Sequence, residues 1–256
     1  MAPLWKRPGV LLGGAAVYGA ATIAVYLTLY EPKKDGSTPA VSDARRLAVF
    51  NSNAAQYDKD LDWDETFMGI SLMRRVLLGS ARGKVLEVAA GTGRNLSYYP
   101  ADAQLTLTDF SDGMLAQARD KRAANCELRV MSASDLQFPG ETFDTVVDTF
   151  GLCSMDDPVA TLREMQRVCR PGGRLLLLEH GRSHYSWLSS VLDKFADAHA
   201  QKWGCHWNRD ILAFVREAGL EVETVRRFHF GTTYYIIAKP KASSNVDVAV
   251  SAVESA

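Results

Sequence analysis

The fold is decided by residues 85–95, which read VLEVAAGTGRN. An apolar, β-branched run predicts a strand over residues 84–89, and Gly91 and Gly93 let the backbone turn tightly and approach a ligand. The helix expected next would direct its free N–H groups at that ligand. Asp109 ends the following predicted strand, 18 residues after Gly91, where a carboxylate can accept hydrogen bonds from both ribose hydroxyls of a nucleoside.

The spacing separates this segment from two other glycine-rich loops. It is not G-x-G-x-x-G, and it is not a P-loop, because no Gly-Lys with Ser or Thr follows the glycines. A bare G-x-G carries little information. Its value here comes from the strand before it, from Glu87 inside that strand and from Asp109 in register.

Outward from this segment, predicted strands alternate with predicted helices. Seven apolar or β-branched runs predict strands over residues 84–89, 104–108, 127–131, 143–150, 174–179, 221–226 and 233–239. The clearest helix, residues 158–169, follows Asp157 as its N-cap, and Ser111 and Asp210 are the N-caps of two more. This order predicts an α/β fold with a mostly parallel, doubly wound, seven-stranded sheet. The short connection at residues 228–231 predicts an antiparallel hairpin at one edge.

The composition is that of a folded protein. Of 256 residues, 47% are hydrophobic and 23% are charged, which is too apolar for a disordered chain. The 29 basic and 30 acidic side chains give a net charge of −1, which argues against nucleic-acid binding because that needs a surplus of Lys and Arg. Four scattered cysteines without a C-x-x-C pair suggest neither a disulfide scaffold nor a structural zinc site.

The two ends differ from the middle. After a short leader, residues 1–8, residues 9–30 carry no charge, and as a helix they would be about 33 Å long, enough to cross a bilayer core of about 30 Å. We expect one transmembrane anchor there; a cleaved signal peptide and a buried helix are the alternatives. Basic residues flank the segment on both sides, so its orientation is not predicted.

The composition of two further segments sets the domain boundaries. Residues 31–42 carry Pro, Gly, Ser and Thr without an apolar period and predict a linker. Residues 240–256 are small and polar and predict a disordered tail. The folded domain is therefore expected over residues 43–239.

Four motifs together resemble those of class I S-adenosylmethionine-dependent methyltransferases: EVAAGTG at 87–93, TDFSDGML at 108–115, FDTVV at 143–147 and RVCRPGGRLLLLEH at 167–180. The resemblance covers about residues 43–239 and is strongest to the ubiquinone/menaquinone-biosynthesis type. Within that type, FGLCS, LLLLEHGR, WGCHWN and GTTYYIIAK resemble a narrower set. These are membrane-anchored methyltransferases of the mitochondrial inner membrane in fungi, known as suppressors of an insertase defect. More distantly, the membrane-anchored thiol S-methyltransferases of animals share the LCS and EH elements.

The resemblance implies a Rossmann-like sheet, S-adenosylmethionine as the cofactor, and roles for single residues. Glu87 would hold the methionine ammonium, directly or through water, and Asp109 would bind the ribose hydroxyls. Phe110 would lie against the adenine, and Thr149 near the sulfonium. The residues expected along the methionine and ribose are Ala89, Gly91, Thr92 and Gly93. Those expected at the adenine edge are Ser132 and Ala133.

Three positions depart from the family's pattern. Ala89 replaces the usual first glycine of the loop, which alanine can do if its φ is negative, so we expect binding to survive. Ser132 stands where many relatives have Asp, so the contact to the adenine amino group weakens or passes to Asp135. Cys153 stands where the quinone C-methyltransferases carry the arginine of F-G-x-R-N. The absence of this arginine argues against methylation of a ring carbon.

Methyl transfer from a sulfonium is an in-line displacement, so the protein must align the nucleophile, exclude water and, for some acceptors, remove a proton. His180 and His206 are the candidate catalytic bases; the alternatives are a histidine satisfied by the backbone and plain packing. Cys153 is expected to be a packed apolar side chain. Cys205 and His206 lack partner ligands at usable spacing, so no metal site is predicted. Tyr57, on a segment that resembles the family's lid helix, either closes over the cofactor or packs as a core aromatic.

The leading prediction is a membrane-anchored methyltransferase that acts on a small lipophilic or membrane-proximal acceptor of the quinol/phenol or thiol class. The resemblance implies the mitochondrial inner membrane. The alternative is a non-catalytic mitochondrial membrane assembly factor that retains the fold, against which the intact set of Glu87, Gly91, Gly93 and Asp109 argues. RNA or protein methylation stays open, since the mild acidity argues only weakly against RNA. The sequence predicts neither protein partners nor an oligomeric state.

Overall fold

The computed structural model describes residues 43–121 and 125–241. Seven strands form one sheet in the order β3-β2-β1-β4-β5-β7-β6. They are β1 (Lys84–Val88), β2 (Gln104–Asp109), β3 (Cys126–Val130), β4 (Phe143–Thr149), β5 (Cys169–His180), β6 (Glu221–Phe228) and β7 (Thr233–Lys239). The strands from β3 to β5 pair in parallel, and β7 pairs antiparallel with both β5 and β6. The predicted mostly parallel sheet with an antiparallel edge hairpin is confirmed.

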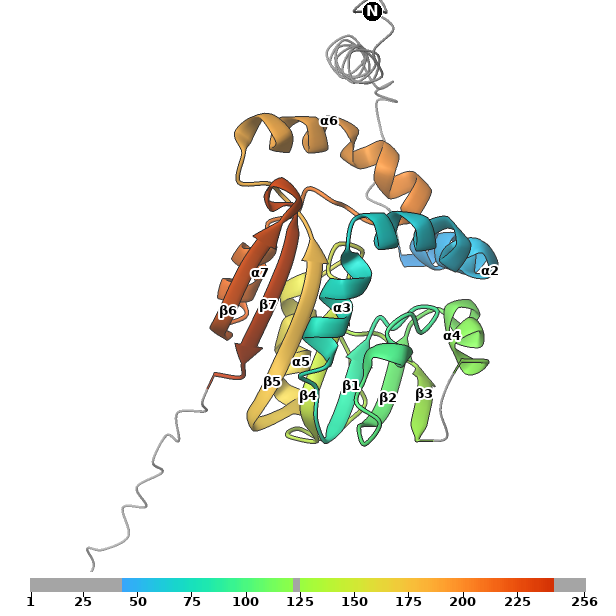
Figure 1. Cartoon of the computed structure of the whole chain (residues 1–256), viewed down its shortest axis with the longest axis vertical. Helices are drawn as coiled ribbons and strands as arrows, with labels where there is room; N and C mark the ends of the chain where they lie inside the picture. The colour runs from blue at the N-terminus through green and yellow to red at the C-terminus, as the bar shows by residue number, and fades with distance from the viewer. Residues whose placement is uncertain (1–42, 122–124, 242–256) are drawn as a thin grey trace, which may run out of the picture.

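Helices pack on both faces of this sheet (Figure 1). α5 (Pro158–Val168) and α7 (Ile211–Glu217) bury apolar side chains on one face, and α3 (Ile70–Leu78) on the other. α5 begins as predicted, because Asp157 Oδ1 accepts a hydrogen bond from the Ala160 N–H at 2.8 Å. Ser111 caps α4 (Asp112–Arg119) and Asp210 caps α7 in the same way.

Two longer helices, α2 (Asp43–Phe67) and α6 (Ser186–Trp203), lie across the carboxyl ends of the parallel strands (Figure 1). Open α/β sheets bind their ligands at this edge. α6 was not predicted, because its buried residues are the small side chains Ser189, Ala196 and Ala200. Such residues leave only a weak apolar period in the sequence.

The α-helix expected after the glycine loop is not formed. The chain between β1 and β2 makes a single 3-10 turn, η2 (Leu96–Tyr98), and the predicted helix is wrong. The crossover is short, and Pro100 disfavours helical geometry in the residue before it. The segment between β1 and β2 therefore supplies no α-helix N-terminus to a ligand, and the N–H groups of Ala90, Gly91 and Gly93 donate within the protein, to the Thr108 carbonyl, Asp109 Oδ2 and the Ala90 carbonyl.

The predicted leader, anchor and linker, residues 1–8, 9–30 and 31–42, lie outside the described residues, as do residues 242–256 of the predicted tail. Between residues 43 and 241, apart from the gap at 122–124, no helix is both long and apolar enough to cross a bilayer.

Candidate active site

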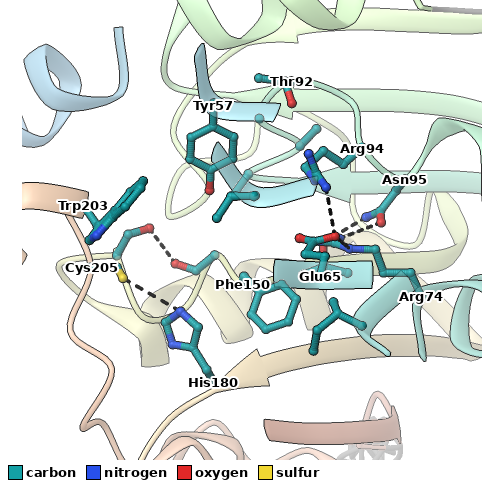
Figure 2. A pocket seen from close by; sticks show the side chains of 18 of the residues that line it. Tyr57, Glu65, Arg74, Thr92, Arg94, Asn95, Phe150, His180, Trp203 and Cys205 are labelled. Atoms are coloured by element: carbon teal, nitrogen blue, oxygen red, sulfur yellow. Dashed lines mark hydrogen bonds and ion pairs between the residues drawn. The ribbon is translucent and has the colours of Figure 1, made fainter. Parts of the chain in front are cut away.

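A cavity of about 440 Å³ lies between α2, α6 and the carboxyl ends of the strands (Figure 2). Its volume falls in the range of about 300–1,000 Å³ that small-molecule sites occupy. Eight residues predicted for the site line it: Glu87, Ala89, Gly91, Thr92, Asp109, Phe110, Thr149 and His180. Four others do not line it: Gly93, Ser132, Ala133 and His206.

Asp109 is positioned by backbone donors. Its Oδ2 accepts from the Gly91 N–H and its Oδ1 from the Ser111 N–H, both at 2.8 Å. Each carboxylate oxygen has a second lone pair, so ribose hydroxyls can still donate to both. A Cβ on Gly91, whose φ is +55°, would meet nothing within 4 Å, so the space beside this carboxylate is open to a ligand. Burial raises the pKa of Asp109 to about 6.

Glu87 is a second buried carboxyl in the cavity wall. It is 2% exposed, and its two oxygens accept hydrogen bonds from Asn95 Nδ2 at 2.8 Å and the Tyr99 hydroxyl at 2.7 Å. Burial raises its pKa to about 7 even though these donors lower it. An ammonium group beside this carboxyl would lower its pKa again and favour the carboxylate form.

Ala89 does not have the negative φ that was predicted for it. Its φ is +48°, in the left-handed region, which costs a non-glycine residue roughly 1–2 kcal/mol. Its Cβ faces Gly151, where an added Cβ would lie 2.8 Å from it. The loops after β1 and β4 thus meet tightly, and the strain is held in the cavity wall.

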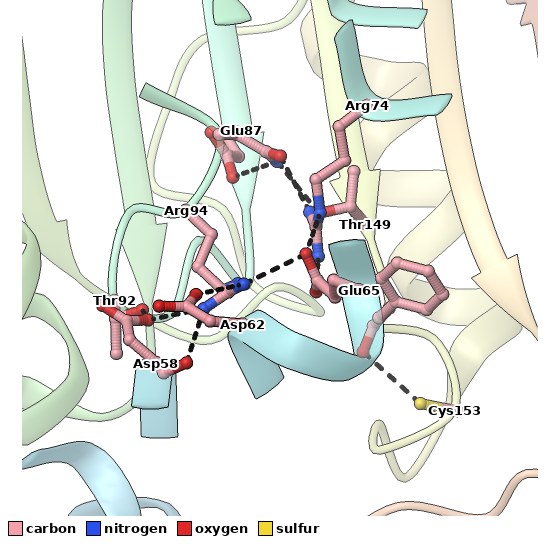
Figure 3. Close-up of polar contacts among 11 residues, drawn as sticks. Asp58, Asp62, Glu65, Arg74, Glu87, Thr92, Arg94, Thr149 and Cys153 are labelled. Atoms are coloured by element: carbon pink, nitrogen blue, oxygen red, sulfur yellow. Dashed lines mark hydrogen bonds and ion pairs between the residues drawn. The ribbon is translucent and has the colours of Figure 1, made fainter. Parts of the chain in front are cut away.

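Sequence reasoning missed Arg74, which is 4% exposed on α3. Its guanidinium donates to both carboxylate oxygens of Glu65, at 3.1 and 2.8 Å, and to Asn95 Oδ1 and Thr149 Oγ1, each at 2.8 Å (Figure 3). The pairing with Glu65 offsets the cost of burying the charge. One signal was available, because Arg74 shares the apolar face of α3 with Ile70, Leu77 and Leu78.

α2 is fastened over the cavity by a second arginine. Arg94, in the loop after β1, pairs with Asp58 at 3.1 Å, Asp62 at 2.9 Å and Glu65 at 3.2 Å, three acids on one face of α2 (Figure 3). The Thr92 hydroxyl also donates to Asp58 at 2.6 Å. The loop that carries the glycine motif and the helix above it are therefore joined directly.

Tyr57, expected either to close over the cofactor or to pack, lines the cavity from α2, and Figure 2 shows its ring within the space. On the α6 side, His180 and Cys205 line the cavity together with His199 and Trp203. The side chain of His206 lies outside this lining, and its backbone N–H donates to the Cys153 carbonyl at 2.8 Å.

Cys153 is fully buried behind His180, with its Sγ 3.7 Å from His180 Nε2. Cys205 Sγ lies 3.9 Å from the same nitrogen (Figure 2). The pKa of Cys205 is well below its usual range, because the Cys153 thiol donates to it and His180 stabilises the thiolate. Cys153 is thus as buried as predicted, but its neighbours are polar.

Comparisons with known proteins agree with this geometry. A family model described as a methyltransferase domain matches residues 86–177. Methyltransferase OMS1, mitochondrial, of Saccharomyces cerevisiae is 32% identical over 214 residues, which cover 75% of this chain and 45% of the yeast protein. The ubiquinone/menaquinone biosynthesis C-methyltransferase UbiE of Cellvibrio japonicus is 38% identical over 174 residues, 62% of this chain and 69% of that protein. The chain therefore spans less than half the length of the yeast relative.

A solved structure shares the fold. The DhpI complex with SAH superposes with a TM-score of 0.60 and 20% identity over 78% of this chain and 97% of that one. The chain belongs to the class I S-adenosylmethionine-dependent methyltransferases, and the resemblance found in its motifs is confirmed. Its cofactor is S-adenosylmethionine, which supplies an activated methyl group.

Proposed function

We propose that this chain is a membrane-anchored methyltransferase of mitochondria that methylates a small lipophilic or membrane-proximal acceptor of the quinol/phenol or thiol class. The observation that carries the proposal is the continuous cavity. One end holds Asp109, Glu87 and the glycine loop. The other end is lined by the aromatic side chains of Phe150 and Trp203 together with His180 and Cys205 (Figure 2), and Met68 and Ile70 add further apolar surface to the lining.

The residues of the first end suit the cofactor. Asp109 binds the ribose hydroxyls, Glu87 the methionine ammonium, and Phe110 lies against the adenine. Arg74 has used four of its five N–H groups, and the remaining one suits the methionine carboxylate. The adenine-edge role of Ser132 and Ala133 stays a prediction, since neither lines the cavity.

The protein's own part in the transfer is alignment, exclusion of water and, where needed, removal of a proton. Arg94 and Thr92 hold α2 over the cavity, and the covering helix excludes water. His180 lines the acceptor end, which suits it as the base for a hydroxyl or thiol. His206 lies outside the lining, so its proposed role is the weaker of the two.

Three observations support an acceptor that comes from a membrane. The uncharged segment 9–30 has the length of a transmembrane helix, and the names of the two relatives place one in mitochondria and the other in quinone biosynthesis. In addition, Phe67 and Phe230 are 82% and 70% exposed, and their chain neighbours Met68 and His229, which line the cavity, are in contact because His229 Nε2 lies 2.9 Å from the Met68 carbonyl. We call Phe67 and Phe230 the aromatic rim and propose that they contact the bilayer beside the cavity.

The test is to incubate the full chain in lipid vesicles with methyl-labelled S-adenosylmethionine and extracts of mitochondrial membranes. Label should enter the organic phase, and Asp109→Ala should abolish it. Competition by added quinol, phenol or thiol would then identify the acceptor class. Cofactor binding without transfer to any of these classes would contradict the proposal. Absence of cofactor binding would favour the non-catalytic assembly factor instead.

A further inference from the structure

Three potential metal ligands converge at the acceptor end of the cavity. Cys153 follows β4, His180 ends β5, and Cys205 follows α6. Their ligand atoms, Sγ, Nε2 and Sγ, all lie within 4.8 Å of one another. We call this group the Cys-His-Cys cluster. No sequence spacing indicated it, because its members come from three separate elements.

The separations in the cluster are close to those around a tetrahedral zinc ion. Zn–S bonds of about 2.3 Å and Zn–N bonds of about 2.0–2.1 Å place sulfur and nitrogen about 3.5 Å apart. His180 Nε2 lies 3.7 Å from Cys153 Sγ and 3.9 Å from Cys205 Sγ. Thiols are weak hydrogen-bond donors and acceptors, so hydrogen bonding alone is a poor reason for burying two of them against one imidazole nitrogen.

The surroundings leave one side of the cluster open. His180 and Cys205 line the cavity, whereas Cys153 is fully buried behind them. His199 Nδ1 lies 3.7 Å from Cys205 Sγ, but its ring stacks on Trp207 at 4.0 Å, which holds it beside the cluster. Two thiolates and one imidazole with a free fourth position are a ligand set of catalytic rather than structural zinc sites.

We propose that Cys153, His180 and Cys205 bind a soft divalent metal ion, Zn²⁺, whose open coordination position faces the cavity and takes the sulfur of an acceptor thiol. The inference of a metal site rests only on the geometry of the Cys-His-Cys cluster. The choice of a thiol as the acceptor rests on the proposed function, and it narrows the acceptor from the quinol/phenol or thiol classes to the thiol class.

The transfer balances without an oxidant or reductant. As a ligand of the ion, His180 Nε2 no longer serves as the base, and the acceptor thiol loses its proton to solvent when its sulfur binds the ion. A lone pair of that sulfur forms a bond to the methyl carbon, and the bond from this carbon to the sulfonium sulfur breaks with its electron pair on the leaving sulfur. The products are a methyl thioether and S-adenosylhomocysteine.

The metal site is tested with Co²⁺ as a spectroscopic substitute, added to the reduced full chain without a polyhistidine tag. One equivalent should give a thiolate-to-cobalt charge-transfer band. Cys153→Ala and Cys205→Ala should each weaken binding by more than about 100-fold, since loss of even an outer partner of a metal ligand costs about 10- to 100-fold. Cys169→Ala, which removes a cysteine buried elsewhere in β5, should bind as the wild type does.

A wild-type chain that gives no charge-transfer band overturns the metal site, whether or not the variants fold. So does a Cys153–Cys205 disulfide whose reduction brings no metal uptake. Circular dichroism of each variant separates loss of the ion from loss of the fold.

The acceptor step has its own readouts. Adding an aliphatic thiol should change the cobalt spectrum, and removing zinc with a chelator should slow methylation of that thiol at least tenfold, because a free thiol is only a few per cent thiolate near pH 7. Unchanged thiol methylation after chelation overturns the step. Failure of the proposed function looks different, because S-adenosylmethionine would then not bind while the cobalt band persisted.

Discussion

Ala89, in the cavity wall, has a strained backbone conformation. Because its φ is +48°, glycine should fit better there than alanine. We expect Ala89→Gly to raise the free energy of unfolding by about 0.5–1 kcal/mol. This is the cost of holding alanine in the left-handed region minus the larger conformational entropy that glycine has in the unfolded chain. Urea unfolding measures it. Ala90→Gly, the neighbouring control, should lower stability, and a loss of stability in Ala89→Gly would show that the strain is absent.

Four buried carboxyl groups should make the stability of the cofactor-free protein depend on pH. Burial raises the pKa of Asp109 to about 6 and of Glu87 to about 7, and it also raises the pKa values of Asp148 and its neighbour Glu179. The neutral forms of these groups stabilise the fold fully below their ordinary pKa values near 4, and this stabilisation is lost as the pH rises through the raised values. The free energy of unfolding should therefore fall from about pH 5 upward through neutral pH.

Urea unfolding across that range checks the pH dependence, and Asp148→Asn is the informative variant because it should flatten the upper part of the curve. The exposed Asp112→Asn on α4 serves as the control and should leave the curve unchanged. A wild-type stability that rises with pH through this window would mean that these carboxyls are ionised in the fold at low cost.

At the scale of elements, Arg94 and Thr92 attach α2 to the glycine loop, and we expect this attachment to control access to the cavity. Arg94→Gln removes the charge that pairs with Asp58, Asp62 and Glu65, so α2 should open more often and S-adenosylmethionine should bind more weakly, by about tenfold for roughly 1.5 kcal/mol. Hydrogen exchange should show faster exchange in α2 with the sheet unchanged. Arg119→Gln, which removes an exposed surface pair with Asp112, is the matched control, and equal effects of both variants would argue against the lid.

The sequence predicted the strands better than the helices above them. The five inner strands could be predicted because they are apolar runs that the sheet largely buries, whereas the edge strands β3 and β6 are mostly exposed and were predicted from short alternating or β-branched runs. The caps Asp157, Ser111 and Asp210 mark three helices through their own hydrogen bonds. α6 and the missing helix after β1 could not be predicted, since one buries only small residues and the other was assumed from the motif. These errors fall on the elements that enclose or adjoin the site.

At the scale of the whole molecule, the site joins residues that the sequence keeps far apart. Glu87 and Asp109 could be predicted because each ends or lies in a strand of the recognisable motif. The burial of Arg74 had a signal, its place on the apolar face of α3, but its pairing with Glu65 and the Cys-His-Cys cluster could not be predicted, because only the crossing of α2 and α6 over the sheet brings these groups to one cavity. Chemistry that depends on such a crossing has no local signature in the chain.

The exposed aromatic rim carries a prediction about membranes. If acceptors enter from a bilayer past Phe67 and Phe230, replacing both with serine should reduce methylation of a lipophilic acceptor in vesicles while S-adenosylmethionine binding stays unchanged. Trp63→Ser, which removes another exposed aromatic on α2 (78% exposed), tests whether any aromatic of this surface matters equally. If the double variant is as active as the wild type, acceptors do not enter the cavity past these two side chains.

The most direct test of the cavity as a methyltransferase site is calorimetric titration of the full chain with S-adenosylmethionine, beside Asp109→Asn. The carboxylate is held by two backbone donors and faces open space at Gly91. Loss of its charged hydrogen bonds to the ribose should cost about 1.5–3 kcal/mol, or roughly 10- to 150-fold in affinity. Binding of one equivalent to the wild type with that loss in the variant is the predicted result. Equal affinity in the two proteins, or no binding to the wild type, would contradict it.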